Sequence, residues 1–212
     1  MVPFERNLLF ASRESELRAI RQALYTGDQT VKVTITGLGG VGKTQLALEL
    51  ACRVRVEHKS FSVIWIPVTS KESFAQAYLS AAKVLGIPGC EHEKADVNSL
   101  VRDHLGNEGT GQWLLIFDNA DDIDLWLGKS GSESDSLIDK LPKSRYGSII
   151  FTMCDKAAGK LAGRGVFEIS EIGEAGGMQV LQNHIIDRAI LNDEGAVAAL
   201  LSRLTYLPLA IV

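Results

Sequence analysis

Residues 31–56 read VKVTITGLGGVGKTQLALELACRVRV, and this stretch decides the fold. Residues 31–36 are mostly β-branched and run directly into a glycine, which predicts a strand. Residues 43–56 carry apolar side chains at helical spacing. The segment between them, residues 37–44, matches the pattern G-x-x-x-x-G-K-[ST], which is typical of a loop that binds nucleotide phosphates. The order strand, glycine loop, helix is the context that this motif requires.

Each residue type in the loop has a chemical reason. Glycine permits backbone angles that let N–H groups point inward at phosphate oxygens, and the following helix adds its positive amino-terminal end. Lys43 is expected to reach the β and γ phosphates, and the Thr44 hydroxyl to hold Mg²⁺. The nucleotide-binding residues expected from the motif and its flank are Gly37, Gly39, Gly40, Val41, Gly42, Lys43, Thr44 and Gln45.

Two other interpretations of the same glycines are open. Gly37, Gly39 and Gly42 also satisfy G-x-G-x-x-G, the pattern of a dinucleotide-binding loop. That fold needs an acidic residue at the end of the second strand, where this sequence has Trp65-Ile66-Pro67. A glycine-rich turn with an incidental lysine is the other alternative. Nucleoside triphosphate binding is the interpretation that explains the whole motif.

An acidic motif follows the apolar run of residues 113–117, which predicts a fully buried strand. Asp118 comes at the carboxyl end of this strand, and ligands of parallel sheets collect at the carboxyl ends of strands. We therefore expect Asp118 to lie beside the glycine loop and to bind Mg²⁺ through water, with Thr44 opposite.

The residues after Asp118 bear on catalysis. Many hydrolytic proteins of this type carry there a carboxylate that orients or deprotonates the attacking water, whereas this sequence has Asn119. An amide orients water but takes no proton, and loss of a general base costs about 10²- to 10⁴-fold in rate. Either Asp121 or Asp122 could substitute, or the two could cap and begin a short helix over residues 123–127. The catalytic candidates are Lys43, Asp118, Asn119, Asp121 and Asp122.

The rest of the chain alternates between helical and extended patterns. Further strands are expected near residues 61–66, 148–152 and 166–169. Because the strands are continuously apolar and separated by helices, we expect a three-layer α/β fold around a five-stranded, mainly parallel sheet, spanning residues 1–170. Residues 171–212 carry two helical stripes and end on an apolar run, which predicts a small helical module that is cut short.

Local signals predict several details. Ser12 is expected to cap a helix within residues 8–25, and Thr69 with Glu72 to form a capping box before a later helix. Residues 155–161 are expected to form a short helix, and residues 128–136 a surface loop. Cys154 is expected to be a buried apolar filler, and core or rim packing is expected for Trp65, Trp113 and Trp126.

Composition and charge exclude other classes of protein. The chain has 212 residues, 46% of them hydrophobic and 23% charged, as in an ordinary globular protein. Lys and Arg number 22 against 26 Asp and Glu, with no basic run, so neither DNA nor RNA is expected as a partner. No apolar stretch reaches the roughly 18 residues that span a bilayer, so no membrane partner is expected. Three widely spaced cysteines suit a reducing compartment, which favours a cytoplasmic location.

With these motifs in place, the sequence resembles the NB-ARC domains of signal-transduction NTPases, found in plant resistance proteins, apoptotic scaffolds and fungal NOD-like receptors. The glycine loop and residues 114–122 match the family's phosphate loop and Walker B region, and Asp-Asn-Ala-Asp-Asp looks most like the fungal members. Residues 10–14 are similar to the family's hydrophobic-Gly-Arg-Glu segment, with Ser12 in place of glycine. The resemblance implies that Phe10 and Arg13 lie against the adenine.

Two later segments are also similar to family motifs. Residues 147–155 resemble the stretch that ends in Thr-Thr-Arg, whose arginine senses the γ-phosphate, and Cys154 holds that position here. Residues 207–210 resemble the Gly-Leu-Pro-Leu motif, with Tyr206 in place of glycine, which implies that Pro208 packs against the base. The resemblance also implies that residues 171–212 are a truncated ARC1-like segment.

The resemblance implies the function of a switch in innate immunity or cell-death signalling. The chain is expected to bind ATP or ADP with Mg²⁺ and to hydrolyse ATP slowly. It is expected to couple the nucleotide state to self-association of a full-length protein whose effector and sensor domains lie outside this segment. Two alternatives are open: a module that binds nucleotide without hydrolysis, and an NTPase that also accepts GTP/GDP, because no Asn-Lys-x-Asp motif fixes the base.

Overall fold

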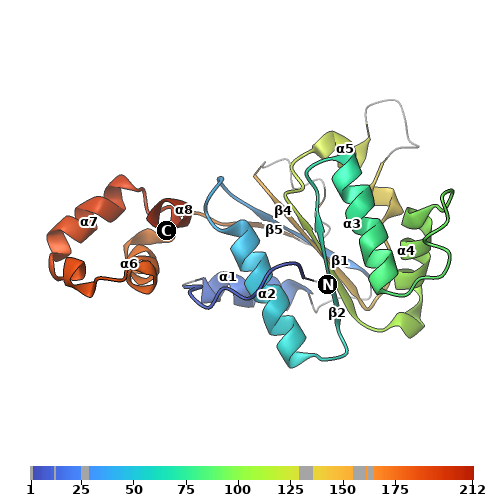
Figure 1. The fold of residues 1–212 in the computed structure, drawn as a ribbon, viewed down its shortest axis with the longest axis horizontal. Helices are drawn as coiled ribbons and strands as arrows, with labels where there is room; N and C mark the ends of the chain where they lie inside the picture. The colour runs from blue at the N-terminus through green and yellow to red at the C-terminus, as the bar shows by residue number, and fades with distance from the viewer. Residues whose placement is uncertain (1, 12, 25–28, 129–135, 155–160, 162–164) are drawn as a thin grey trace.

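The computed structural model describes residues 2–11, 13–24, 29–128, 136–154, 161 and 165–212 (Figure 1). At its centre is one sheet with the strands β1 Val31–Thr36, β2 Ser62–Pro67, β3 Trp113–Asp118, β4 Gly147–Met153 and β5 Gly165–Glu168. The strands lie in the order β2-β3-β4-β1-β5, and every pairing is parallel. The α/β fold and the five-stranded sheet expected from the sequence are confirmed, and the sheet is parallel throughout.

The strand order brings the two predicted motifs to the same edge of the sheet. β4 lies between β1 and β3, with Thr36 of β1 paired to Met153 and Phe117 of β3 paired to Phe151. The glycine loop that follows β1 and the aspartate that ends β3 therefore flank the carboxyl end of β4. β4 is buried along its whole length, whereas β5, at one edge of the sheet, alternates between half-buried and exposed residues.

Helices cover both faces of the sheet (Figure 1). On one face lie α1 Glu14–Leu24 and α2 Lys43–Glu57, and on the other lie α3 Lys71–Val84, α4 Val97–Gly106 and α5 Ile123–Leu127. α1 packs on the sheet through its buried residues Leu17, Ile20 and Leu24. All three tryptophans are buried in these two cores, which confirms the packing expected for them.

The C-terminal helices form a smaller cluster at one end of the molecule, beyond the edge of the sheet (Figure 1). They are α6 Gly173–His184, α7 Glu194–Arg203 and α8 Pro208–Ile211, and the buried residues that they share are Val180, Leu181, Val197, Leu201 and Ile211. Ala11, from the N-terminal segment, joins the same cluster. In the part of the chain that the structure describes there are also three short 3-10 helices: η1 Glu108–Thr110, η3 Ile138–Lys140 and η5 Arg188–Asn192.

One local prediction was wrong by a single residue. The capping box of α3 is formed by Ser70 and Ser73, because the helix begins at Lys71 and Ser73 is therefore its third residue. Glu72 lies in the first turn, and Thr69 contacts the Ser73 hydroxyl from outside the helix. Ser12 and most of the predicted segments 128–136 and 155–161 lie outside the described residues. Among the described residues, no helix combines the length and apolar character needed to cross a membrane.

Candidate functional site

The glycine loop joins β1 to α2 at the carboxyl edge of the sheet. Gly40 and Gly42 have φ angles of +82° and +95°, in the left-handed region that favours glycine. A Cβ added to Gly37 would lie 2.2 Å from the carbonyl oxygen of Ile169, just after β5. The loop therefore needs glycine both to turn and to approach the backbone of Ile169 closely.

Lys43 begins α2, and its ammonium folds back over the glycine loop. Its Nζ donates to the carbonyl oxygens of Gly37 at 2.9 Å and Leu38 at 3.0 Å, and it lies 3.1 Å from Cys154 Sγ. The amino-terminal end of α2 adds its partial positive charge at the same place. The loop is thus an electropositive corner in a chain whose net charge is −4.

The structure brings together Thr44 and Asp118, which the sequence predicted from separate motifs. Oδ1 of Asp118 accepts a hydrogen bond of 2.9 Å from the Thr44 hydroxyl and one of 2.6 Å from the Thr152 hydroxyl. The Thr152 oxygen in turn accepts from the backbone N–H of Asn119 at 3.0 Å. Thr152, near the end of β4, orients the Asp118 carboxylate and was not among the predicted site residues.

The oxygen atoms of Thr44 and Asp118 fit a magnesium ion. Mg²⁺ prefers hard oxygen donors and is usually held by one or two protein groups together with phosphates and water. Among the described residues, no group of three or more His, Cys, Asp or Glu side chains could hold a metal. The donor set beside the glycine loop therefore suits a metal that shares its ligands with a phosphate.

The three polar residues after Asp118 have different surroundings. Asn119 lines the cavity beside the glycine loop and has a φ angle of +61°. Asp122 is the N-cap of α5 and accepts a hydrogen bond of 3.0 Å from the N–H of Leu125. Asp121 accepts a hydrogen bond from the backbone N–H of Cys154. Both aspartates therefore already accept a backbone hydrogen bond in this structure.

Cys154 is exposed, so the prediction of a buried apolar filler was wrong. β4 ends at Met153, and Cys154 is the first residue beyond the buried part of the strand. Its side chain lines the cavity and contacts Lys43. Arg145 does not supply a guanidinium at this position, because its side chain pairs with Glu108.

Arg13 ties the glycine loop to the chain that follows β5. Its side chain is 6% exposed, and Nη2 donates to the carbonyl oxygens of Val41 at 3.0 Å and Ser170 at 2.5 Å. Nη1 donates to Glu16 at 3.0 Å. Arg13 and its neighbour Phe10 both line the cavity.

The C-terminal helix α8 packs directly on the glycine loop. The N–H of Leu209 donates to the carbonyl oxygen of Gly40 at 3.2 Å, and Pro208 is the first residue of α8. Tyr206, which replaces the glycine of the family motif, has a φ angle of +53°. A left-handed backbone at this position explains why glycine suits it. Pro208 and Leu209 both line the cavity.

These segments enclose a cavity of about 470 Å³, within the usual range for small-molecule sites. Of the predicted binding residues, those that line it are Phe10, Arg13, Gly39, Gly40, Val41, Gly42, Lys43, Thr44, Gln45 and Pro208. Sequence reasoning missed another group of lining residues: Asn7, Leu9, Ala11, Thr152, Ile172, Val180, His184, Leu209 and Val212. Most of these come from the N-terminal segment and the C-terminal helices, which lie far from the glycine loop in the sequence.

This chain is similar in sequence to a known protein family and to two longer proteins. A family model described as the NB-ARC domain matches residues 13–185. A nucleotide-binding leucine-rich repeat (NLR)-like protein of the fungus Hyaloscypha variabilis is 42% identical over 220 aligned residues, covering 99% of this chain. Disease resistance RPP13-like protein 4 of Arabidopsis thaliana is 25% identical over 149 residues, covering 69% of this chain. This chain spans only 22% and 16% of the lengths of these two relatives.

Solved structures share the fold at low sequence identity. The Orc1 protein of Aeropyrum pernix, determined in complex with DNA, superposes with a TM-score of 0.63 at 16% identity over 95% of this chain and 58% of its own. Cdc6p of Pyrobaculum aerophilum superposes with a TM-score of 0.58 at 17% identity, over 86% of this chain and 51% of its own. At such identities the likeness concerns the fold alone.

Proposed function

Because the chain belongs to the NB-ARC domain family, we propose that it is the nucleotide switch of a longer, NLR-like signalling protein. In this proposal it binds ATP or ADP with Mg²⁺ in the cavity beside the glycine loop and hydrolyses ATP slowly. The observation that carries the proposal is the convergence of the Lys43 ammonium, the Thr44 hydroxyl and the Asp118 carboxylate at that loop. Three chemical groups that phosphoryl transfer requires come from two separate strand ends.

The proposed roles follow from the contacts of each residue. The Lys43 ammonium, now hydrogen bonded to loop carbonyls, exchanges these partners for the β and γ phosphates. Thr44 and Asp118 hold Mg²⁺, which when bound neutralises charge that develops on the phosphates. Phe10 and Pro208, which both line the cavity, pack against the base, and Arg13 holds the glycine loop through the carbonyl oxygen of Val41.

Slow hydrolysis is supported by the side chains that follow Asp118 and by the lining of the cavity. Asn119 offers an amide rather than a base, and Asp121 and Asp122 accept backbone hydrogen bonds. Among the described residues that line the cavity, the one arginine is Arg13, and its guanidinium donates hydrogen bonds to backbone carbonyl oxygens. Without an arginine on the γ-phosphate, intrinsic hydrolysis of related P-loop switches is on the order of 10⁻⁴ s⁻¹.

Single-turnover phosphate release tests the proposal. Wild type is expected to release phosphate from bound ATP at less than about one per second, Lys43→Ala to release none, and Asn119→Asp to release it faster because a carboxylate can take the proton of water. Turnover of tens per second by wild type would refute the switch and indicate an efficient hydrolase.

A module that binds nucleotide without hydrolysis is the second candidate, favoured by the amide of Asn119 and the thiol of Cys154 at the phosphate side. Absence of phosphate release at every Mg²⁺ concentration, with binding intact, would establish it. Base preference is a separate question, because GTP is also a candidate ligand. Competition among ATP, GTP, CTP and UTP for the same site would settle it.

The setting of the switch is also part of the proposal. Family membership supports self-association of the full-length protein through domains outside this segment. The three free cysteines support a reducing, cytoplasmic location. The glycine loop supports nucleotide as the direct partner, and the charge balance gives no support for DNA or RNA.

A further inference from the structure

The N-terminal strap, residues 6–11, forms one wall of the cavity although it has no helix or strand. Asn7, Leu9, Phe10 and Ala11 all line the cavity. A segment without regular hydrogen bonding keeps its place only through contacts with other elements. The contacts that hold the strap therefore decide the shape of this wall.

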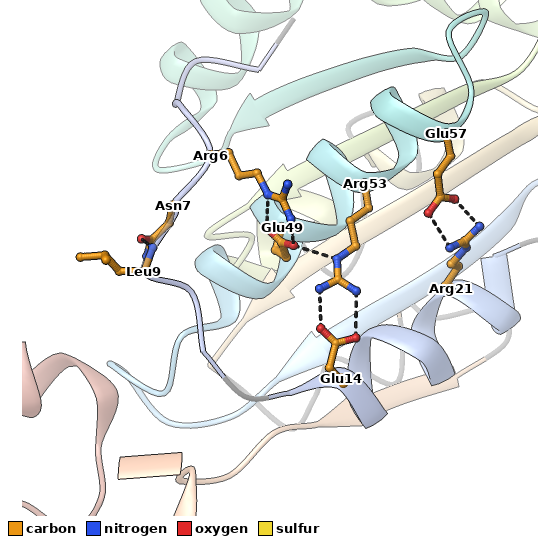
Figure 2. Close-up of polar contacts among 8 residues, drawn as sticks. All are labelled: Arg6, Asn7, Leu9, Glu14, Arg21, Glu49, Arg53 and Glu57. Carbon is orange, nitrogen blue, oxygen red and sulfur yellow. Dashed lines mark hydrogen bonds and ion pairs between the residues drawn. The ribbon is translucent and has the colours of Figure 1, made fainter. Parts of the chain in front are cut away.

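The strap is tied to α2 by a buried carboxylate (Figure 2). Arg6 donates to Glu49 through Nε at 2.9 Å and Nη2 at 2.6 Å, a two-pronged geometry that fixes orientation as well as distance. Glu49 is 3% exposed and also accepts from Arg53 Nε at 2.7 Å. Arg53 in turn donates to Glu14 at the start of α1.

Two weaker ties continue the strap from this anchor. Asn7 Nδ2 donates to Gln45, the residue after Thr44, at 3.1 Å. Asn183 of α6 donates to the carbonyl oxygen of Leu9 at 3.2 Å. The strap thus runs from the helix that follows the glycine loop to the C-terminal helices, and Arg6–Glu49 is its one charged anchor in the described residues.

The charges of the cluster make Glu49 its centre. Burial is the largest single influence and raises the pKa of Glu49, but the hydrogen bonds and positive charges of Arg6 and Arg53 together hold this pKa below its ordinary value. Glu49 is ionised at neutral pH and therefore needs a cationic partner. Arg53 remains as a partner when Arg6 is removed, so the strap can be released without leaving a buried charge unpaired.

We propose that Glu49 and Arg6 are positioning residues of the nucleotide site, which hold the strap against the base and ribose of a bound nucleotide and make no contribution to phosphate binding. This inference rests on the proposed nucleotide binding. It separates the site into a phosphate half, built by the glycine loop, and a base half, whose wall depends on a salt bridge about a turn and a half of helix beyond Thr44.

The test compares a ligand that has a base with one that has none. Binding of ADP and of inorganic tripolyphosphate, each with Mg²⁺, is measured calorimetrically for wild type, Arg6→Gln and Glu49→Gln. Arg6→Gln is expected to lower the affinity for ADP about tenfold and to leave the affinity for tripolyphosphate unchanged. A tenfold loss corresponds to a strap that adopts its binding-competent position a tenth of the time. Arg6→Lys keeps the charge and loses the two-pronged geometry. Its affinity for ADP is expected to lie between those of wild type and Arg6→Gln.

A matched control lies on the same pair of helices. Arg21 of α1 donates to Glu57 at the far end of α2 at 2.8 Å, away from the cavity (Figure 2). Glu57→Gln removes an ion pair between α1 and α2 and is expected to leave the affinity for both ligands unchanged. Arg6 is 48% exposed, so Arg6→Gln keeps the test available if Glu49→Gln fails to fold.

The outcomes separate the inference from the function on which it rests. If Arg6→Gln lost affinity for ADP and tripolyphosphate equally, or lost affinity for neither, the inference would be overturned and nucleotide binding would stand. Binding of neither ligand by wild type would overturn both. Hydrogen exchange gives a second readout: the amides of Leu9 and Phe10, which donate to Asn7, are expected to exchange faster in Arg6→Gln and not in Glu57→Gln.

Discussion

The hydroxyl of Thr152 holds the acidic strand end in place, and its removal is a sharp test of the site. Thr152 is 1% exposed and makes two hydrogen bonds, one to the Asp118 carboxylate and one from the N–H of Asn119. The substitution Thr152→Val keeps the shape of the side chain and removes both bonds. After the substitution, Oδ1 of Asp118 still accepts the hydrogen bond from the Thr44 hydroxyl.

The size of the effect follows from the two bonds. A hydrogen bond between neutral groups contributes about 1 kcal/mol net, and one to a charged group about 1.5–3 kcal/mol. Asp118 is half-buried, so solvent screens its part and the lower end applies. We expect a loss of about 2 kcal/mol in the free energy of unfolding, which lowers Tm by about 4–8 °C for a chain of this length.

Thermal unfolding and Mg²⁺-dependent nucleotide binding measure the two consequences. Thr152→Val is expected to lose stability and to require more Mg²⁺ for nucleotide binding, because the Asp118 carboxylate is less well oriented. Thr152→Ser keeps the hydroxyl and is expected to retain most of both properties. An unchanged Tm and an unchanged Mg²⁺ requirement in Thr152→Val would refute the reasoning.

Three other predictions concern the loop, the strap and the phosphate side. Gly37→Ala places a Cβ against the Ile169 carbonyl and is expected to cost at least about 2 kcal/mol of stability by urea unfolding; Gly39→Ala, with nothing within 4 Å, serves as its control. Because the pKa of Glu49 is held below 4.5, its ion pairs contribute stability above that pH and lose it as pH falls further; urea unfolding between pH 7 and pH 3 should show a smaller acid loss in Glu49→Gln than in wild type. Cys154→Arg is expected to speed single-turnover phosphate release by up to about 10³-fold, while the uncharged Cys154→Met should not; equal rates would argue against a phosphate-facing position for residue 154.

The sheet and the phosphate half of the site were predictable because their signals are local. A β-branched strand, a glycine loop and a helix follow one another without interruption, so pattern and spacing suffice. The parallel alignment of strand ends then brings Asp118 to Thr44. Physical rules of sheets therefore connect two motifs about seventy residues apart.

The base half could not be predicted in the same way because its contacts are long-range. Asn183 reaches Leu9, and Leu209 reaches Gly40, through the folding of the C-terminal helices onto the N-terminal strap. The burial of Glu49 within α2 carries no sequence signal, since a charged residue in a helix usually faces solvent. Cys154 was misplaced because an apolar residue was expected to be buried, whereas β4 ends at Met153 and the next residue lies outside the buried strand.

Calorimetric titration of nucleotide into wild type and Lys43→Ala tests nucleotide binding at the glycine loop most directly. With Mg²⁺ present, wild type is expected to bind one ADP or ATP per chain. Lys43→Ala is expected to bind about 10- to 150-fold more weakly, because it loses charge-assisted hydrogen bonds to the phosphates. Equal affinity in the two proteins, or no binding by wild type, would contradict a nucleotide site at this loop.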